Sequence, residues 1–259
     1  MNRRRLGLIA AAALMLAPAA LVPSAQAWAP KASADPVAKA LADGRRTTEE
    51  VARDARSKPS QVIAFAGVKP GMHVADLVIG TGYYSKIFGA LVGPSGKVWA
   101  WQPGEFAASN PAYKEPLNYL PPAFPNMTTN GNDFGQFAPP SGLDVAFTNM
   151  NYHDFHLSAF PATTAANVNA KVFAALKPGG VYVIIDHYAL PGAEPRVSAQ
   201  TLHRIDPAVV RREVEAAGFV FDGQSDLLRN PADPKTAKVF DPSIYGKTDQ
   251  FMLRFKKPG

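Results

Sequence analysis

The chain has 259 residues, 47% of them hydrophobic, which is enough for one sizeable core. It contains no Cys, and this excludes disulfides, thiolate nucleophiles and cysteine metal sites. The formal net charge is +6, but three of the positive charges lie at residues 3–5. Of the 27 Lys and Arg, 24 lie beyond this segment, against 21 Asp and Glu, and they form no dense basic cluster. We therefore expect no nucleic-acid partner.

Residues 1–27 are typical of a secretory signal peptide. A basic start at Arg3–Arg5 precedes an apolar, Ala-rich run over 6–21, and Ala25-Gln26-Ala27 offers the small residues that signal peptidase accepts. A membrane anchor is the alternative, but the run is short and Pro18 interrupts it. We predict cleavage after Ala27, a periplasmic or secreted location, and no stable membrane insertion after cleavage.

Residues 28–58 are predicted to form a helical lead-in to a domain over 59–259. Thr47-Thr48-Glu49-Glu50 has the pattern of a capping box, and Lys58-Pro59-Ser60 should end the helix that it starts. A second short helix is expected over 61–68.

A glycine turn follows the first predicted strand. The apolar run 74–79 breaks at Gly80-Thr81-Gly82, and a helical pattern over 85–92 comes next. Glycines let a backbone approach a ligand closely, and a helix N-terminus offers free N–H groups. This order of strand, glycine turn and helix favours a nucleotide-type cofactor site. An ordinary strand-to-helix turn is the alternative.

Strands and helices then alternate along the chain. Residues 104–125 hold five prolines, and we predict an elaborated connection or lid there, with at most one short helical stretch at 115–120. The other expected elements are strands at 97–101, 143–148, 181–185, from 219 and at 250–255, and helices from Pro161 and from Pro207. Alternating elements with apolar strands predict one α/β domain with a doubly wound sheet.

With these elements placed, the chain resembles a class I S-adenosylmethionine-dependent methyltransferase from about residue 61 onward. Asp76, Gly80 and Gly82 match three of the four positions in the acid-x-Gly-x-Gly-x-Gly motif of that family. Lys177-Pro178-Gly179-Gly180 and Gly218-Phe219 are similar to the turns before its fifth and sixth strands. The resemblance implies a Rossmann-like, seven-stranded, mostly parallel sheet with one antiparallel strand near the C-terminus.

The resemblance also implies S-adenosylmethionine as cofactor and roles for particular residues. Asp76, Gly80 and Gly82 would contact its methionine end, with Tyr83 alongside. Asp133 and Phe134 look like the segment whose Asp binds the adenine amino group, and Asn149 would line the methyl-transfer cleft. The expected cofactor-binding residues are Asp76, Gly80, Gly82, Tyr83, Gln102, Asp133, Phe134 and Asn149.

Two positions depart from the family pattern. Val78 replaces the first glycine, and Gln102 stands where the family usually has an acid that holds both ribose hydroxyls. An amide oxygen accepts less strongly than a carboxylate, so weaker cofactor binding or a changed ligand is expected. Glu105 is close enough in sequence to substitute for the missing acid.

Three histidines are expected at the carboxyl edge of the sheet. His153 precedes Asp154 after one strand, His187 follows Asp186 at the end of the next, and His203 lies before a helix. A His with a nearby carboxylate can act as a general base, so His153, His187 and His203 are the candidate catalytic residues. Each could instead be a polar loop residue or a helix cap.

Converging histidines and carboxylates could alternatively hold a divalent metal, but no tight ligand spacing is present, and we predict no metal ligand. Several tyrosines could form an aromatic wall for an organic acceptor or a sulfonium, or could simply pack in the core. These are Tyr83, Tyr84, Tyr152 and Tyr188.

Other enzyme classes fit less well. A dinucleotide fingerprint would place a third glycine where Ser85 stands, and no Gly-x-Ser-x-Gly elbow is present for a hydrolase. Two hypotheses remain: an exported methyltransferase acting on a small organic acceptor, and a non-catalytic periplasmic ligand-binding protein with a methyltransferase-like fold.

Overall fold

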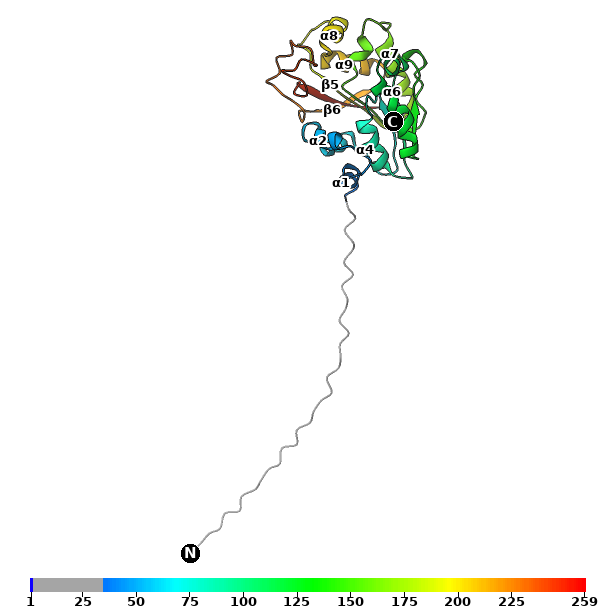
Figure 1. The fold of residues 1–259 in the computed structure, drawn as a ribbon, viewed down its shortest axis with the longest axis vertical. Coiled ribbons are helices and arrows are strands. Elements are labelled where there is room, and N and C mark those ends of the chain that lie inside the picture. The colour runs from blue at the N-terminus through cyan, green and yellow to red at the C-terminus, as the bar shows by residue number, and fades with distance from the viewer. Residues whose placement is uncertain (2–34) are drawn as a thin grey trace. The chain divides into compact units, whose positions relative to one another are not determined.

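The computed structural model describes Met1 and residues 35–259, so the predicted signal peptide lies, apart from its first residue, outside the described residues. Residues 35–259 belong to one compact unit (Figure 1). Within this part of the chain, no helix is both long and apolar enough to cross a membrane.

A seven-stranded sheet forms the centre of this unit. Its strands are β1 (His73–Leu77), β2 (Lys97–Trp101), β3 (Met127–Asn130), β4 (Leu143–Asn149), β5 (Leu176–His187), β6 (Val220–Ser225) and β7 (Gln250–Lys256). They lie in the order β3-β2-β1-β4-β5-β7-β6. Only β7 runs antiparallel to its neighbours, which confirms the predicted topology.

Helices occupy both faces of the sheet. They are α1 (Pro36–Leu41), α2 (Thr48–Ser57), α3 (Pro59–Ala66), α4 (Tyr83–Val92), α5 (Gly104–Ser109), α6 (Pro111–Ala123), α7 (Thr164–Ala175), α8 (Pro195–Leu202) and α9 (Pro207–Ala216). Two 3₁₀ turns, η1 (Phe134–Gln136) and η2 (His153–His156), lie beside β4 in sequence. Figure 1 shows α2 and α4 on one side of the sheet and α7, α8 and α9 on the other.

Strand residues alternate between two apolar cores, as the period of a strand requires. Ala75 and Leu77 of β1 pack with α7 and α9, whereas Val74 packs with α3 and α4. Both faces of the central strands are therefore buried, which explains their nearly continuous apolar sequence.

The predicted capping box is present at the start of α2. The Thr47 side chain accepts from the Glu50 backbone N–H, and the Glu50 carboxylate accepts from the Thr47 backbone N–H. Lys58 then adopts a left-handed conformation between α2 and α3, where the Lys-Pro break is expected.

The Pro-rich connection is more helical than the sequence indicates. Residues 104–123 form α5 and α6, although α6 contains three internal prolines. Pro121 has no N–H for the carbonyl of Leu117, and the Thr129 hydroxyl donates to that carbonyl instead, at 2.7 Å. This tertiary contact replaces the hydrogen bond that the helix loses at the Leu117 carbonyl. The local sequence around α6 gives no sign of it.

Candidate functional site

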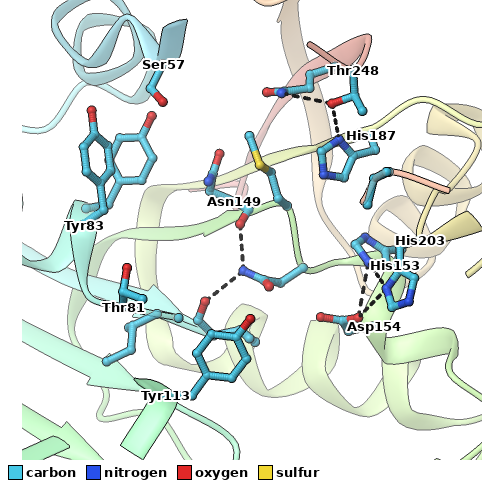
Figure 2. A pocket seen from close by; sticks show the side chains of 18 of the residues that line it. Ser57, Thr81, Tyr83, Tyr113, Asn149, His153, Asp154, His187, His203 and Thr248 are labelled. Carbon is cyan, nitrogen blue, oxygen red and sulfur yellow. Dashed lines mark hydrogen bonds and ion pairs between the residues drawn. The ribbon is translucent and has the colours of Figure 1, made fainter. Parts of the chain in front are cut away.

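A pocket of about 490 Å³ lies beyond the carboxyl ends of β1, β2, β4 and β5. The strand order reverses between β1 and β4, and ligands of open α/β sheets bind at such a switch point. Helix α2 and the loop between β6 and β7, residues 226–249, add to the lining. So do residues of α4, α5 and α6, the segment after β4, and the end of α8. Figure 2 shows Tyr83 and Thr81 on one side of the pocket and the histidines on the other. The volume is in the range of small-molecule sites.

The turn after β1 keeps the backbone shape of a glycine turn without its first glycine. Val78 has φ = 57°, in the left-handed region that a β-branched residue rarely adopts, and Gly80 has φ = 55°. A Cβ at Gly80 would meet nothing within 4 Å, so glycine is required there for its conformation and leaves the backbone open to the pocket.

Asp76 is a buried carboxyl in the pocket wall. The Ser85 hydroxyl donates to it at 2.5 Å, and burial raises its pKa to about 7. A cation bound beside Asp76 would favour its ionised form. Ser85, which breaks the dinucleotide fingerprint in the sequence, thus has the role of holding this carboxyl.

Gln102 fixes the glycine turn from the end of β2. Its Oε1 accepts from the Gly80 N–H at 2.8 Å. Its Nε2 is buried and has no hydrogen-bond partner among the residues that the structure describes. The side chain therefore offers a ligand a donor, where the family pattern has an acceptor.

Asn149 and Asn151 shape the floor of the pocket. Asn149 ends β4 and lines the pocket, as predicted from the resemblance. The Asn151 amide donates to the carbonyls of Val78 and Asn149, at 2.8 and 2.7 Å. It thereby ties the glycine turn to the end of β4, a role that the sequence analysis missed.

The three predicted histidines all reach this pocket. His153 Nδ1 lies 2.8 Å from Asp186 Oδ1, and its Nε2 lies 3.2 Å from Asp154 and 3.3 Å from His203 Nδ1. Burial works to lower the pKa of His153, but the charges of Asp186 and Asp154 outweigh it and raise that pKa.

Burial lowers the pKa of both His187 and His203. Burial lowers the pKa of His187 to about 3, and its Nδ1 lies 2.7 Å from the Thr248 hydroxyl. The pKa of His203 is lowered by burial and by the charge of His153, yet 21% of its side chain is exposed.

No protein-family model and no curated protein matches this sequence. Solved structures do match. A SAM-dependent methyltransferase from Aquifex aeolicus is 20% identical with a TM-score of 0.55, covering 86% of this chain and 98% of its own. The [4+2]-cyclase SpnF is 15% identical with a TM-score of 0.53, and the match covers 86% of this chain and 92% of SpnF. A possible exported protein from Bordetella parapertussis is 16% identical with a TM-score of 0.51, and the match covers 80% of this chain and 68% of that protein.

These similarities, with the single antiparallel strand between β5 and β6, decide the architecture. The chain has the class I methyltransferase fold. SpnF shares this fold with a different chemistry, so function has to be argued from the site.

Within the methyltransferase fold, Asp133, Phe134 and Gly82 lie outside the lining of the pocket. Asp133 is exposed and lies against Gly104, where an added Cβ would come 2.2 Å from the carboxylate. Phe134 is buried among aromatic rings that include Phe106 and Phe160. Their adenine-binding role stays a prediction, as does the cofactor contact of Gly82.

Glu105 does not replace the missing acid at the pocket. Its carboxylate accepts from the Phe134 backbone N–H at 3.1 Å, and it is absent from the pocket lining. Of these two residues, only Gln102 lines the pocket, and its contact with a ribose stays a prediction.

Two of the four tyrosines line the pocket. Tyr83 and Tyr84 are buried there, and the Tyr83 hydroxyl donates to Asp54 of α2 at 2.6 Å. Tyr152 is instead a core residue that donates to Glu213, and Tyr188 packs on Phe251 away from the pocket.

The sequence analysis missed the residues that α2 and the β6–β7 loop bring to the pocket. These are Arg53, Arg56 and Ser57 from α2, and Val239, Phe240, Tyr245, Gly246 and Thr248 from the loop. No local motif marks them, because they reach the pocket only when distant segments pack together.

Proposed function

We propose that this protein is an S-adenosylmethionine-dependent methyltransferase that acts on a small organic acceptor and is exported to the periplasm or secreted. One observation carries the enzymatic part. A buried carboxyl, an open glycine turn and an unpartnered buried amide donor share a single pocket with three histidines.

The residues present fit the cofactor at its polar groups. Asp76 would meet the positively charged methionine end, and the open backbone at Gly80 lets the ligand approach closely. The free Nε2 of Gln102 can donate to a ribose hydroxyl. Tyr83 and Tyr84 line the same side of the pocket, but the Tyr83 ring already has the Arg53 and Arg46 guanidinium groups over it, at 4.2 and 5.5 Å from its centroid.

Bound there, S-adenosylmethionine supplies a methyl group attached to a positively charged sulfur. The chain's own contribution is to hold the acceptor in line with that methyl group and to keep water out. The histidine side of the pocket is where an acceptor would lose its proton. His203 is the best placed of the three, because it is neutral and partly exposed.

A second candidate is a non-catalytic protein of the same fold that binds a ligand in this pocket. Two features favour it. The bulky Val78 occupies the first glycine position of the motif, and the Gln102 oxygen is already engaged by Gly80. Both features would weaken adenosyl binding.

Calorimetric titration with S-adenosylmethionine tests the proposal. We expect saturable heat for the full-length chain and a loss of at least tenfold in affinity for Asp76→Ala. The control Asp222→Ala, in an ion pair between β6 and β7 outside the pocket lining, should bind like the unmodified chain. No heat at high micromolar ligand would remove the enzymatic proposal. Binding without methyl transfer to any acceptor in a panel of small alcohols, amines and thiols would favour the second candidate.

The location is proposed from the N-terminal sequence, and the Bordetella parapertussis protein of the same fold is described as a possible exported protein. Expression in a Gram-negative host followed by osmotic shock tests it. A periplasmic product whose first residue is Trp28 is expected, and a cytoplasmic product that begins at Met1 would contradict it.

A further inference from the structure

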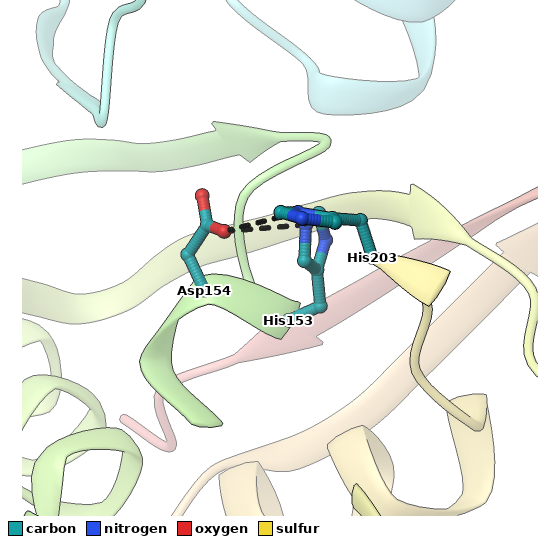
Figure 3. A group of neighbouring side chains, drawn as sticks. All are labelled: His153, Asp154 and His203. Carbon is teal, nitrogen blue, oxygen red and sulfur yellow. Dashed lines mark hydrogen bonds and ion pairs between the residues drawn. The ribbon is translucent and has the colours of Figure 1, made fainter. Parts of the chain in front are cut away.

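Three side chains aim potential metal-binding atoms at one point in the pocket wall. His153 Nε2 lies 3.2 Å from Asp154 Oδ1 and 3.3 Å from His203 Nδ1, and His203 Nδ1 lies 3.9 Å from Asp154 Oδ1. Figure 3 shows the Asp154 carboxylate facing both imidazole rings. The group meets the spacing that a shared ion requires.

These separations suit coordination to a small transition-metal ion. Bonds of 2.0–2.1 Å at tetrahedral angles place two ligand atoms roughly 3.4 Å apart. The distances from His153 Nε2 to Asp154 and to His203 fall near that value. Small side-chain rotations would shorten the distance of 3.9 Å between His203 and Asp154 to the same value.

Asp186 orients His153 in the way that metal-binding histidines are usually oriented. Its Oδ1 accepts from His153 Nδ1 at 2.8 Å, which leaves Nε2 to point at Asp154 and His203. Asp186 is itself fully buried and is held by the backbone N–H groups of His153 and His187, at 2.8 and 2.7 Å. The carboxylate–histidine pair is therefore rigid.

The backbone also commits His203 to this position. His203 is the C-cap of α8 with φ = 53°, a left-handed conformation that histidine adopts more readily than most other residue types. The ring of Phe240 lies with its centroid 4.9 Å from that of His203 and covers it from the β6–β7 loop. The C-cap conformation and the Phe240 ring together limit where the imidazole can lie.

We propose that His153, Asp154 and His203 bind a divalent transition-metal ion of the Zn²⁺ type. Two imidazoles and one carboxylate suit such ions better than Mg²⁺ or Ca²⁺, which prefer oxygen ligands. Three protein ligands leave a coordination position open, as in catalytic rather than structural sites. All three residues line the pocket, so that position faces a bound small molecule with an oxygen donor. In this arrangement His203 is a ligand and not a free base.

Metal titration of the full-length chain, stripped with a chelator and without S-adenosylmethionine, tests the site. We expect one Zn²⁺ per chain by calorimetry, and with Co²⁺ the intense visible bands of a four- or five-coordinate ion. His203→Asn and Asp154→Asn should weaken Zn²⁺ binding at least tenfold, since Asn tolerates the left-handed backbone at position 203. Asp186→Asn keeps the three ligands and should weaken binding by roughly 10–100-fold.

His73→Asn is the matched control, because it removes a histidine at the start of β1, at the opposite edge of the sheet. It should bind Zn²⁺ as the unmodified chain does. An unmodified chain that binds neither ion, a Co²⁺ spectrum like that of the aqueous ion, or unchanged affinity in His203→Asn would overturn the proposal. The Co²⁺ spectrum needs no variant, so it decides the question even if a variant fails to fold. Failure to bind S-adenosylmethionine would leave this result untouched.

Discussion

At the scale of single residues, the site combines strain with buried charge. Val78 holds a left-handed backbone, and Asp76, two residues earlier in β1, is a carboxyl removed from water. Each feature costs stability, and both lie where the pocket meets the end of β1. Such destabilising features are expected at a ligand-binding site rather than elsewhere in the fold.

Replacing Val78 by Gly should cost little stability. Left-handed geometry costs an L-residue roughly 1–2 kcal/mol, which glycine recovers, while the lost burial of Val costs about 1.5–3 kcal/mol. Val74→Gly, inside the preceding strand β1 and similarly buried, recovers no strain. Chemical denaturation should therefore show Val78→Gly losing about 1–2 kcal/mol less than Val74→Gly. Equal losses would mean that position 78 is not strained.

Asp76 should make stability depend on pH in an unusual direction. Its folded pKa of about 7 lies above the ordinary value of 3.8, so between those pH values the folded chain holds a proton that the unfolded chain has lost. Its contribution to folding therefore falls as pH rises from about 4 to 7. Unfolding free energies across this range should show that decline in the unmodified chain and not in Asp76→Asn. Parallel curves would contradict the raised pKa.

At the scale of elements, the β6–β7 loop is held over the pocket by buried ion pairs. Arg204 binds Asp233 through two hydrogen bonds, of 2.8 and 3.1 Å, and both side chains are fully buried. Asp249 accepts from Arg229 and pairs with Lys235 in the same loop. These contacts fix the segment that carries Phe240 and Tyr245 to the pocket.

Removing one member of the buried pair should loosen this loop. Asp233→Ala leaves Arg204 charged and without its partner, which typically costs about 3–5 kcal/mol. Hydrogen exchange should rise across residues 226–249 before it rises in the sheet. The control Arg211→Ala removes an exposed pair with Glu215 and a contact with the Phe221 ring, and it should change stability by about 1 kcal/mol or less. An unchanged loop in Asp233→Ala would show that other contacts hold it.

At the scale of the whole molecule, one pocket draws residues from α2, from four strand ends and from the β6–β7 loop. A ligand there would bridge segments that are up to about 200 residues apart in sequence. Binding energy should therefore appear as global stability, because the unfolded chain has no such pocket.

S-adenosylmethionine should accordingly raise the melting temperature. At a hundredfold excess over the dissociation constant, the expected stabilisation is about 2.7 kcal/mol. Thermal unfolding followed by circular dichroism at increasing ligand measures it, and Asp76→Ala should show a smaller shift at the same concentration. An unmodified chain whose melting temperature does not move at millimolar ligand would argue against the cofactor.

Most of the fold follows from sequence periodicity. The apolar runs of β1, β4 and β5 and the break at Gly80-Thr81-Gly82 already indicate strands and a turn. Lys177-Pro178-Gly179-Gly180, expected as a turn before a strand, lies instead within β5, which begins at Leu176. Local patterns miss α5 and β3. They indicate only residues 115–120 of α6, because prolines mask a longer helix whose lost hydrogen bond is replaced from Thr129.

The sequence by itself determined which residues end the strands, and therefore that Asp76, Gln102, His153 and His187 would lie at one edge of the sheet. Only the tertiary structure decided what those residues do there. It turned Asp186 toward His153, brought His203 from 50 residues away to the same point, and engaged the Gln102 oxygen with Gly80. The physical reason is range: strand and turn propensities act over a few neighbouring residues, whereas a side chain's partners, burial and pKa depend on segments that meet only in the folded chain.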